Sequence, residues 1–353
     1  MLLLSLQMNA KKYLTNCRLI KLLVLMALFF ILVTACHNSE NQLSNTSMQR
    51  AETIAECRVV EHSLGETCMP VHPQRIIAVE TVFLDSLFAL GFKKSVIGTI
   101  CYPIPYASEE CFPFGVPSDQ LKDVESIGSY PPSLEKILLL KPDLILGLDW
   151  MEPTYEQLSN IAPTVLLHWS DDWNLSFKTY FRHIAQVTGR EDVAEEVISQ
   201  YQTQISEVKR QLGDRLKNVE VSAVLYGHAG NKEFSVPPRY AIWFQILDDL
   251  GIKIKPIFSM QRDWSSSLSI ELINNYDSDI LFIFNSFSKS LNFFNEPVNS
   301  LLEKPLVATL KAVKNKRAYV IDGQDTFDVY GPSGVNRLLE LLSRHLLEAA
   351  ETF

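Results

Sequence analysis

Short apolar runs alternate with amphipathic runs along this chain, and the pattern occurs twice, on either side of a long amphipathic segment. Short apolar runs are typical of buried strands, and runs with a three-to-four-residue period are typical of helices. We expect strands at 75–79, 95–98, 143–148, 163–168, 221–227, 279–284 and 318–322. We expect helices at 82–91, 133–141, 240–251, 304–313 and about 335–350. This alternation predicts an α/β fold, with a central and mostly parallel sheet flanked by helices in each half.

Residues 191–212 lie between the two halves and predict one long helix without glycine or proline. At 1.5 Å per residue it would be roughly 33 Å long, and we interpret it as a stiff connection between two lobes. The alternative is an ordinary surface helix within one domain. The apolar stripe expected on this helix consists of Val193, Val197, Tyr201, Ile205, Val208 and Leu212. The expected bounds are about 74–174 for the N-lobe, about 175–214 for the linking helix and about 218–353 for the C-lobe.

The first residues have the pattern of an export signal that ends at a cysteine. A basic segment without acidic residues precedes an unbroken apolar run at 22–33. A membrane-spanning helix needs about 20 residues, so the run fits a signal peptide better than a span. The end, Val33-Thr34-Ala35-Cys36, resembles the lipobox of bacterial lipoproteins, which implies removal of 1–35 and a lipid (diacylglycerol, palmitate) on Cys36. The alternatives are an ordinary signal peptide with an incidental cysteine, or an uncleaved anchor.

The chain that would remain is acidic and begins with a polar segment. Residues 36–56 are rich in Asn, Ser, Gln and Glu and predict a flexible tether. Without residues 1–35 the chain has 28 Lys and Arg against 41 Asp and Glu. This balance argues against nucleic acid or an anionic lipid surface as a partner.

Four cysteines follow the tether, an even number in an exported chain. Their spacing suggests two local disulfides, Cys57–Cys68 and Cys101–Cys111, the first closing a hairpin within 57–73. Such a loop would contribute about 3 kcal/mol to stability by the chain-entropy estimate. Free thiols or a metal site are the alternatives, although thiolate metal sites usually contain a C-x-x-C pair and this chain has none.

One helix–strand unit occurs in both halves. The segments 133–148 and 269–284 align without gaps, with Ser, Glu, Ile and Asp at corresponding positions. We expect each unit to be a short helix that leads into a buried strand, with Glu135 or Glu271 in the first helical turn. From the residues alone we favour helix capping, with serine as the N-cap and glutamate interacting with the helix dipole.

The chain resembles the periplasmic binding proteins of the ferric-siderophore and vitamin B12 type, which capture ligands for importers driven by ATP. The resemblance covers roughly residues 70–350 and rests on the order of segments such as PQRIIAVE, SLEKILLLKPDLILG, WSSSLSIELI, KPLVATLKAVKNKRAYVID and GPSGVNRLLELL. In that family the first-turn glutamate of each lobe docks against arginines of a dimeric membrane permease. The resemblance therefore implies that Glu135 and Glu271 are docking residues, and here it outweighs the capping interpretation.

The resemblance also implies a ligand groove between the lobes, lined by loops at the carboxyl ends of strands. Aromatic side chains and a non-titrating arginine suit a large, often anionic ferric chelate. The candidate residues are Glu80, Tyr102, Tyr130, Trp150, Tyr226, Arg239, Trp264, Ser286 and Tyr330. Relatives often carry Trp-Gly-Gly-Pro near the end, whereas this chain has Tyr330-Gly331-Pro332, and this departure bears on the identity of the ligand.

We therefore expect a monomeric lipoprotein at the cell membrane, facing the periplasm or the cell exterior, that binds a ferric siderophore and uses no cofactor of its own. Capture of haem or a corrinoid is the first alternative. Binding of a bare metal ion is less favoured, because the histidines are scattered and such ions need clustered ligands. A structural lipoprotein remains a further alternative. We do not expect an enzyme, since no G-x-S-x-G, H-E-x-x-H or P-loop motif occurs.

Overall fold

The computed structural model describes nine ranges of the chain. They are 57–103, 111–112, 116–168, 176–226, 234–236, 241–255, 267–285, 299–322 and 331–353. Residues Arg58–Phe353 form one compact unit. In the described ranges, no helix combines the length and the apolar character that a membrane span requires. The expected signal peptide, tether and lobe bounds stay predictions.

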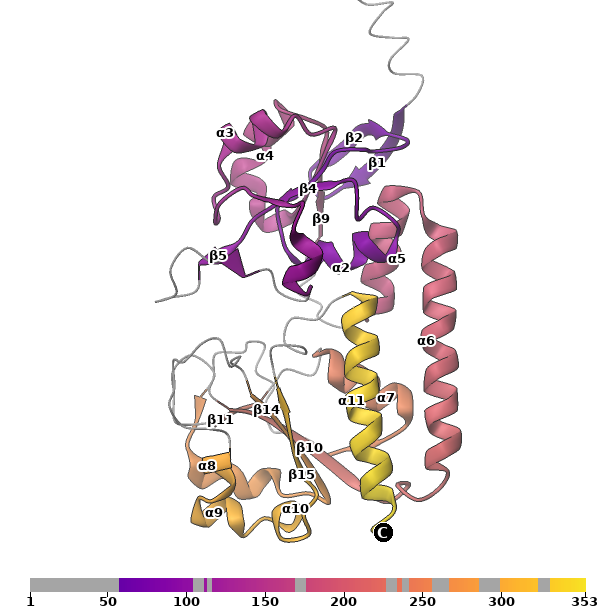
Figure 1. Ribbon diagram of the computed structural model, residues 1–353, viewed down its shortest axis with the longest axis vertical. Coiled ribbons are helices and arrows are strands. Elements are labelled where there is room, and N and C mark those ends of the chain that lie inside the picture. Colours follow the sequence, from indigo (N-terminus) through magenta and orange to yellow (C-terminus); the bar gives the residue numbers. More distant parts are fainter. Residues whose placement is uncertain are drawn as a thin grey trace, which may run out of the picture. The chain divides into compact units, whose positions relative to one another are not determined.

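The N-lobe is built on a five-stranded sheet in the order β7-β4-β3-β8-β9, and all of its pairs are parallel (Figure 1). Alternate residues of β3 and β8 enter two different apolar clusters, so both faces of the sheet are buried, as parallel sheets require. The strands are β3 (Ile76–Ala78), β4 (Val96–Thr99), β7 (Glu125–Ser126), β8 (Leu144–Leu148) and β9 (Thr164–Leu167). The helices are α2 (Val82–Ala89), α3 (Leu134–Leu140), α4 (Glu152–Ser159) and the 3₁₀ segments Ser118–Leu121 (η1) and Asp149–Met151 (η2).

Two small strand pairs accompany this lobe. Strands β1 (Cys57–His62) and β2 (Gly65–Pro70) form a two-stranded sheet, and β5 (Tyr102–Pro103) pairs antiparallel with β6 (Cys111–Phe112). Cys57, Cys68 and Cys101 are disulfide-bonded. The side chain of Cys111 lies outside the described part of the chain, and the expected pairing of the four cysteines stays a prediction.

The C-lobe is built on a six-stranded sheet in the order β13-β11-β10-β14-β15, with β12 paired to β10. The pairs among β10, β12, β14 and β15 are parallel, and β11 joins β10 and β13 antiparallel. The strands are β10 (Glu220–Tyr226), β11 (Phe234–Ser235), β12 (Lys253–Ile254), β13 (Ser267–Leu268), β14 (Ile280–Asn285) and β15 (Ala318–Asp322). The helical elements are α7 (Ile242–Leu250), the 3₁₀ helix η4 (Ile270–Tyr276), α8 (Asn299–Leu302), α9 (Pro305–Ala308), α10 (Lys311–Lys314) and α11 (Pro332–Ala350).

The prediction of a single helix at 304–313 was wrong, because the segment forms two short helices. Leu310 between them has extended backbone angles, with φ −61° and ψ 143°. The carboxylate of Asp277 accepts a hydrogen bond from the Lys311 N–H at 2.7 Å, which gives α10 its own N-terminal cap. A cap from a distant residue thus decides a helix start that the local sequence does not show.

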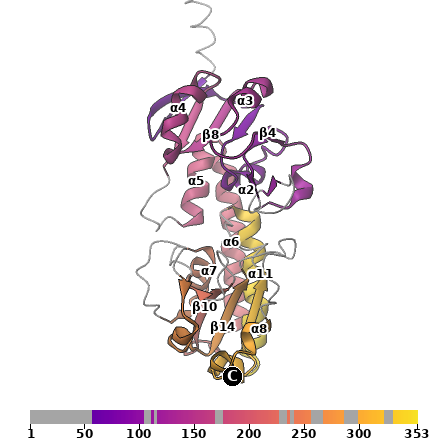
Figure 2. The same cartoon turned by 90° about the vertical axis from the view of Figure 1, so that its left-hand side faces the viewer.

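The long helix α6 (Glu191–Leu212) has the bounds expected from the sequence and contributes to both cores. Ala194 and Ile198 join the N-lobe cluster, while Tyr201, Ile205 and Leu212 join the C-lobe cluster. In the N-terminal part of α6 the expected apolar stripe was wrong by one position. Val193 and Val197 are only partly buried, and the next residues, Ala194 and Ile198, are the buried ones. Figures 1 and 2 both show α6 running alongside α11. A separate helix, α5 (Phe177–Thr188), precedes α6 and ends at Gly189 with a left-handed backbone, φ 67°, so the segment 175–214 is two helices.

Helix α5 is fastened to α7 of the C-lobe by polar contacts. The side-chain oxygen of Gln245 accepts a hydrogen bond from the Phe177 N–H at 2.9 Å, and Lys178 forms an ion pair with Asp249 at 2.9 Å. Tyr201 of α6 donates its hydroxyl to the same aspartate at 2.7 Å. Burial, together with this carboxylate, raises the pKa of the Tyr201 hydroxyl. The helices at the lobe junction are therefore held by hydrogen bonds as well as by apolar packing.

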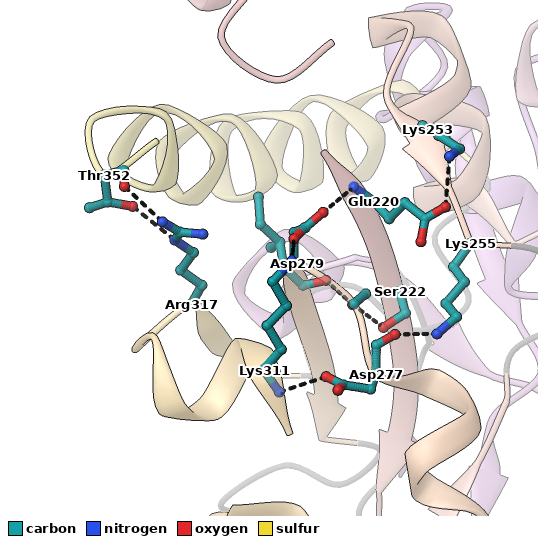
Figure 3. A network of polar contacts seen from close by, with 11 residues as sticks. Glu220, Ser222, Lys253, Lys255, Asp277, Asp279, Lys311, Arg317 and Thr352 are labelled. Carbon is teal, nitrogen blue, oxygen red and sulfur yellow. Dashed lines mark hydrogen bonds and ion pairs between the residues drawn. The ribbon is translucent and has the colours of Figure 1, made fainter. Parts of the chain in front are cut away.

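A network of polar contacts connects the beginnings of the C-lobe strands (Figure 3). The carboxylate of Asp279 accepts a hydrogen bond from the Glu220 N–H at 2.9 Å and also binds Lys311. Ser222 donates to the carbonyl of Tyr276 at 2.6 Å. At the chain end, Arg317 donates to the hydroxyl and the carbonyl of Thr352 at 2.9 and 2.7 Å. These contacts hold together the amino-terminal ends of the parallel strands and join them to the last residues of the chain.

Candidate functional site

The duplicated helix–strand unit takes corresponding positions in the two lobes. Ser133 is the N-cap of α3 and accepts a hydrogen bond from the Lys136 N–H at 3.3 Å. Ser269 is the N-cap of η4 and accepts from the Glu271 N–H at 3.4 Å. The serine of each unit therefore starts its helix, as the sequence predicted. The C-lobe copy differs in being a 3₁₀ helix.

Two further shared positions also have structural roles. Ile137 and Ile273 are buried in the cores of their lobes. The carboxylate of Asp143 accepts hydrogen bonds from the Gln74 and Arg75 N–H groups at 2.8 and 2.9 Å, and Asp279 binds the start of β10 in the same way. Each aspartate thus ties its own strand to the start of the neighbouring parallel strand.

The shared glutamates are the remaining position. Glu135 and Glu271 are both exposed, each in the first turn of its helix. Among the described residues, neither carboxylate takes part in a hydrogen bond or an ion pair. Three of the four shared residues therefore stabilise the fold, whereas the fourth leaves one carboxylate on the surface of each lobe.

The surroundings of the two glutamates differ. Leu138 and Leu139, one turn after Glu135, are exposed by 60% and 72%. The corresponding residues after Glu271 are Asn274 and Asn275, which are also exposed. In the α-helix α3, side chains three and four positions apart lie on one face, so Leu138 and Leu139 lie beside Glu135. In the 3₁₀ helix η4 the residue three positions on, Asn274, lies on the same side as Glu271. The exposed surface one turn after the carboxylate is therefore apolar in the N-lobe and polar in the C-lobe.

Two of the expected ligand residues lie together in the N-lobe. Trp150 lies in η2, two residues after the end of β8, and is 42% exposed. Its ring contacts that of Tyr130 edge-on, with centroids 4.7 Å apart. Tyr130 packs partly against the core beneath it. The pair presents aromatic surface near the carboxyl end of a central strand, where ligands of open α/β sheets bind.

Two other candidates lie inside the protein. Glu80 is buried and accepts a hydrogen bond from the Thr81 N–H at 2.8 Å. Burial and the negative charge of Glu80 raise the pKa of the Tyr180 hydroxyl. Tyr226 is also buried, at the end of β10, with the Lys304 ammonium 5.6 Å from the centre of its ring. Their expected contact with a ligand stays a prediction.

The remaining candidates fall beyond the part of the chain that the structure describes. Cys36, Arg239, Trp264, Ser286 and Tyr330 lie outside it, and Tyr102 is described only by its backbone in β5. The loops after β9, β10, β14 and β15 lie outside it as well. Within the described residues, no group of three or more His, Cys, Asp or Glu side chains is arranged to hold a metal ion.

The sequence did not single out Asp85, a buried carboxylate in α2. Its side chain accepts a hydrogen bond from the Gly334 N–H of α11 at 3.0 Å, across 249 residues of sequence. The one available signal was an acidic residue within the largely apolar helix VFLDSLFA. A buried charge requires a partner, but the sequence does not show where that partner lies.

Known proteins resemble this chain over most of its length. It is 28% identical over 340 residues to the probable siderophore-binding lipoprotein YfiY of Bacillus subtilis, covering 93% of this chain and 98% of the relative. It is 26% identical over 274 residues to the ferric-anguibactin-binding protein FatB of Vibrio anguillarum, covering 75% and 79%. The crystal structure of the petrobactin-binding protein YclQ of Bacillus subtilis has the same fold, with a TM-score of 0.64 at 20% identity, covering 82% and 99%.

The family model described as periplasmic binding protein matches residues 76–324. This match includes both sheets, α6 and both copies of the duplicated unit. The two-lobe α/β fold with its connecting helix is the one predicted from the sequence. The chain belongs to the periplasmic binding protein family.

Proposed function

We propose that this chain is the lipid-anchored binding component of an ABC importer, which captures a ferric siderophore and delivers it to a membrane permease. The observation that carries the proposal is the similarity to the probable siderophore-binding lipoprotein YfiY over 98% of that protein's length. The family is one of binding proteins, and we propose that this chain is likewise not an enzyme.

The chemistry of iron favours recognition of a whole chelate. Iron(III) is nearly insoluble unless it is chelated, so the importer must recognise the outer shape of the chelate. We propose that the siderophore fills the iron coordination sphere and that the protein supplies aromatic surface and positive charge. The contact between Tyr130 and Trp150 supports the aromatic part, since rigid rings offer large contact areas. Arg239 is the proposed cation, because a guanidinium keeps its charge at every relevant pH.

The duplicated unit supports a docking role for Glu135 and Glu271. The serines, isoleucines and aspartates of the unit stabilise the two lobes, and the glutamates place carboxylates on the surface that have no partner in the described part of the chain. Two carboxylates, one on each lobe, suit a permease dimer with one basic site on each half. Leu138 and Leu139 beside Glu135 differ from Asn274 one turn after Glu271, so the two docking surfaces are not equivalent. In this proposal the chain is a monomer, held at the membrane by the lipid on Cys36 and facing the periplasm or the cell exterior.

A ligand screen tests this function. The mature chain, starting at residue 36, is titrated with hydroxamate, catecholate and citrate chelates of iron, and tryptophan fluorescence is recorded. We expect at least one ferric chelate to bind tightly and to quench tryptophan fluorescence. The quenching should be smaller in Trp150→Phe if the exposed indole lies at the site. If the chain binds none of these chelates but binds haem or cobalamin, capture of haem or a corrinoid would replace this proposal.

A further inference from the structure

The last helix, α11, begins without a capping side chain of its own. Its N-cap residue is Gly331, and Pro332 occupies the first helical position. Because proline has no N–H and the Val335 N–H already donates to the Gly331 carbonyl at 3.1 Å, the N–H groups of Ser333 and Gly334 need an acceptor. In most helices a Ser, Thr, Asp or Asn at the N-cap supplies it. Here the local sequence has none at that position.

Asp85 of α2 supplies the missing acceptor. One of its carboxylate oxygens is 3.0 Å from the Gly334 nitrogen, and Ser333 also donates to this carboxylate through its N–H and its hydroxyl. Asp85 as a whole residue is 7% exposed. Burial raises the pKa of Asp85, while these hydrogen bonds and the charge of Arg337, one turn further along α11, act in the opposite direction. The helix dipole also favours a negative charge at this place.

The contact between Asp85 and the start of α11 is so close that residue 331 must be glycine. A Cβ atom at residue 331 would lie 2.4 Å from the Asp85 Cβ and 2.5 Å from its Oδ2. Any other residue would displace either the carboxylate or the helix. The Gly331-Pro332 pair in Tyr330-Gly331-Pro332 therefore has a structural explanation, since glycine admits Asp85 and proline leaves one fewer N–H to satisfy.

The contact joins the two lobes. Helix α2 contributes Phe83, Leu84 and Leu87 to the N-lobe core, whereas α11 contributes Val335 and Leu338 to the C-lobe core. Helix α6, which contributes to both cores, and the contacts of α5 with α7 also connect the lobes. The cap differs from both, because one side chain of one lobe completes the hydrogen bonds of a helix in the other.

We propose that Asp85 and Gly331 form an inter-lobe latch, in which a helix cap supplied by the N-lobe fixes the orientation of the C-lobe. Loss of the latch leaves each lobe folded and widens the range of their relative orientations. Asp85 is thus a positioning residue, which acts on a ligand between the lobes only through this orientation. That last step rests on the proposed function, whereas the latch does not.

The latch is tested on the ligand-free mature chain by two measurements. Hydrogen exchange reports the amides of Ser333 and Gly334. A distance distribution between spin labels reports lobe orientation, with labels attached through non-natural amino acids at the exposed residues Glu156 and Lys314. We expect Asp85→Gly to speed exchange at residues 333 and 334 about fivefold, the factor for a lost helix cap, and to broaden the distance distribution. Ser133→Ala is the matched control, because it removes a cap within the N-lobe and should leave the distribution narrow.

A double variant separates capping from latching. Asp85→Gly combined with Gly331→Ser moves the cap onto α11 itself, and removal of the Asp85 side chain makes room for the serine. We expect slow exchange at residue 334 to return while the distance distribution stays broad. A narrow distribution in this variant would overturn the latch, because the cap would then matter only for the helix.

Asp85→Ala covers the case in which Asp85→Gly does not fold, because alanine favours the helical conformation of α2. It removes both acceptor oxygens, and we expect a broadening of the same distribution. A distribution identical to that of the unchanged protein would overturn the proposal. Faster ligand release from Asp85→Ala is expected under the proposed function. Unchanged release with a broadened distribution would count against the ligand site between the lobes and would leave the latch intact.

Discussion

Replacing Asp143 by alanine should destabilise the protein without affecting its docking surface. The carboxylate accepts two backbone hydrogen bonds, at 2.8 and 2.9 Å, from residues just before β3. A hydrogen bond to a charged group contributes about 1.5–3 kcal/mol, and the lower value applies to both because the site is only partly buried. The expected loss is therefore about 3 kcal/mol. At about 2 °C per kcal/mol for a domain of this size, the melting temperature should fall by about 6 °C.

Calorimetry of the mature chain measures this change, and Glu135→Ala is the matched control on the same unit. The control removes an exposed carboxylate that has no partner among the described residues, so its melting temperature should stay within about 1 °C. A fall of under 2 °C in Asp143→Ala, or an equal fall in both variants, would refute the division of the unit into structural and surface positions.

Three further predictions concern docking, the anchor and pH. Glu135→Ala combined with Glu271→Ala should leave siderophore affinity intact and reduce uptake far more than either change alone, because single exposed ion pairs contribute little. Normal uptake by the double variant would instead support a role of the two glutamates in helix capping alone. Cys36→Ser should abolish lipid attachment, so mass analysis of the N-terminal peptide from membranes should find an acylated Cys36 only in the unchanged chain. A variant that is still processed and still retained in the membrane would contradict the lipid anchor. Burial raises the pKa of Asp279, but hydrogen bonds from Lys311 and Glu220 outweigh this and leave the pKa below its usual value. The ionised carboxylate therefore stabilises the fold above about pH 4, and this contribution is lost as the pH falls through the folded pKa. Asp279→Asn should lower stability at pH 7 and have little effect near pH 2, as urea unfolding at the two pH values will show; an equal effect at both would contradict the role of the charge.

Much of the fold was predictable because its strands are buried on both faces. The apolar runs 143–148 and 279–284 correspond to β8 and β14 almost residue for residue. Helix α6 was delimited correctly because Gly189 and Gly213 flank it and neither glycine nor proline interrupts it. The duplicated unit was also visible, since both of its copies keep the serine, isoleucine and aspartate that their helix and strand need.

Features that depend on distant contacts were not predictable. The break between α9 and α10 depends on a cap from Asp277, which lies 34 residues earlier. The role of Asp85 depends on a helix that begins 247 residues later. In both cases a side chain satisfies backbone groups of another segment, and a local pattern of residues contains no trace of such a partner. The candidate ligand residues were chosen by their place after strands, and of these the structure brings together Tyr130 and Trp150.

The central claim is that the protein recognises iron only within its chelate, and titration calorimetry of the mature chain tests it most directly. A ferric siderophore found in the fluorescence screen is compared with the same siderophore without iron and with a soluble iron(III) salt of a weak ligand. We predict tight one-to-one binding of the ferric chelate, weaker binding of the iron-free form and no binding of iron by itself. Equal affinity for the ferric and iron-free forms, or binding of iron without a siderophore, would contradict it.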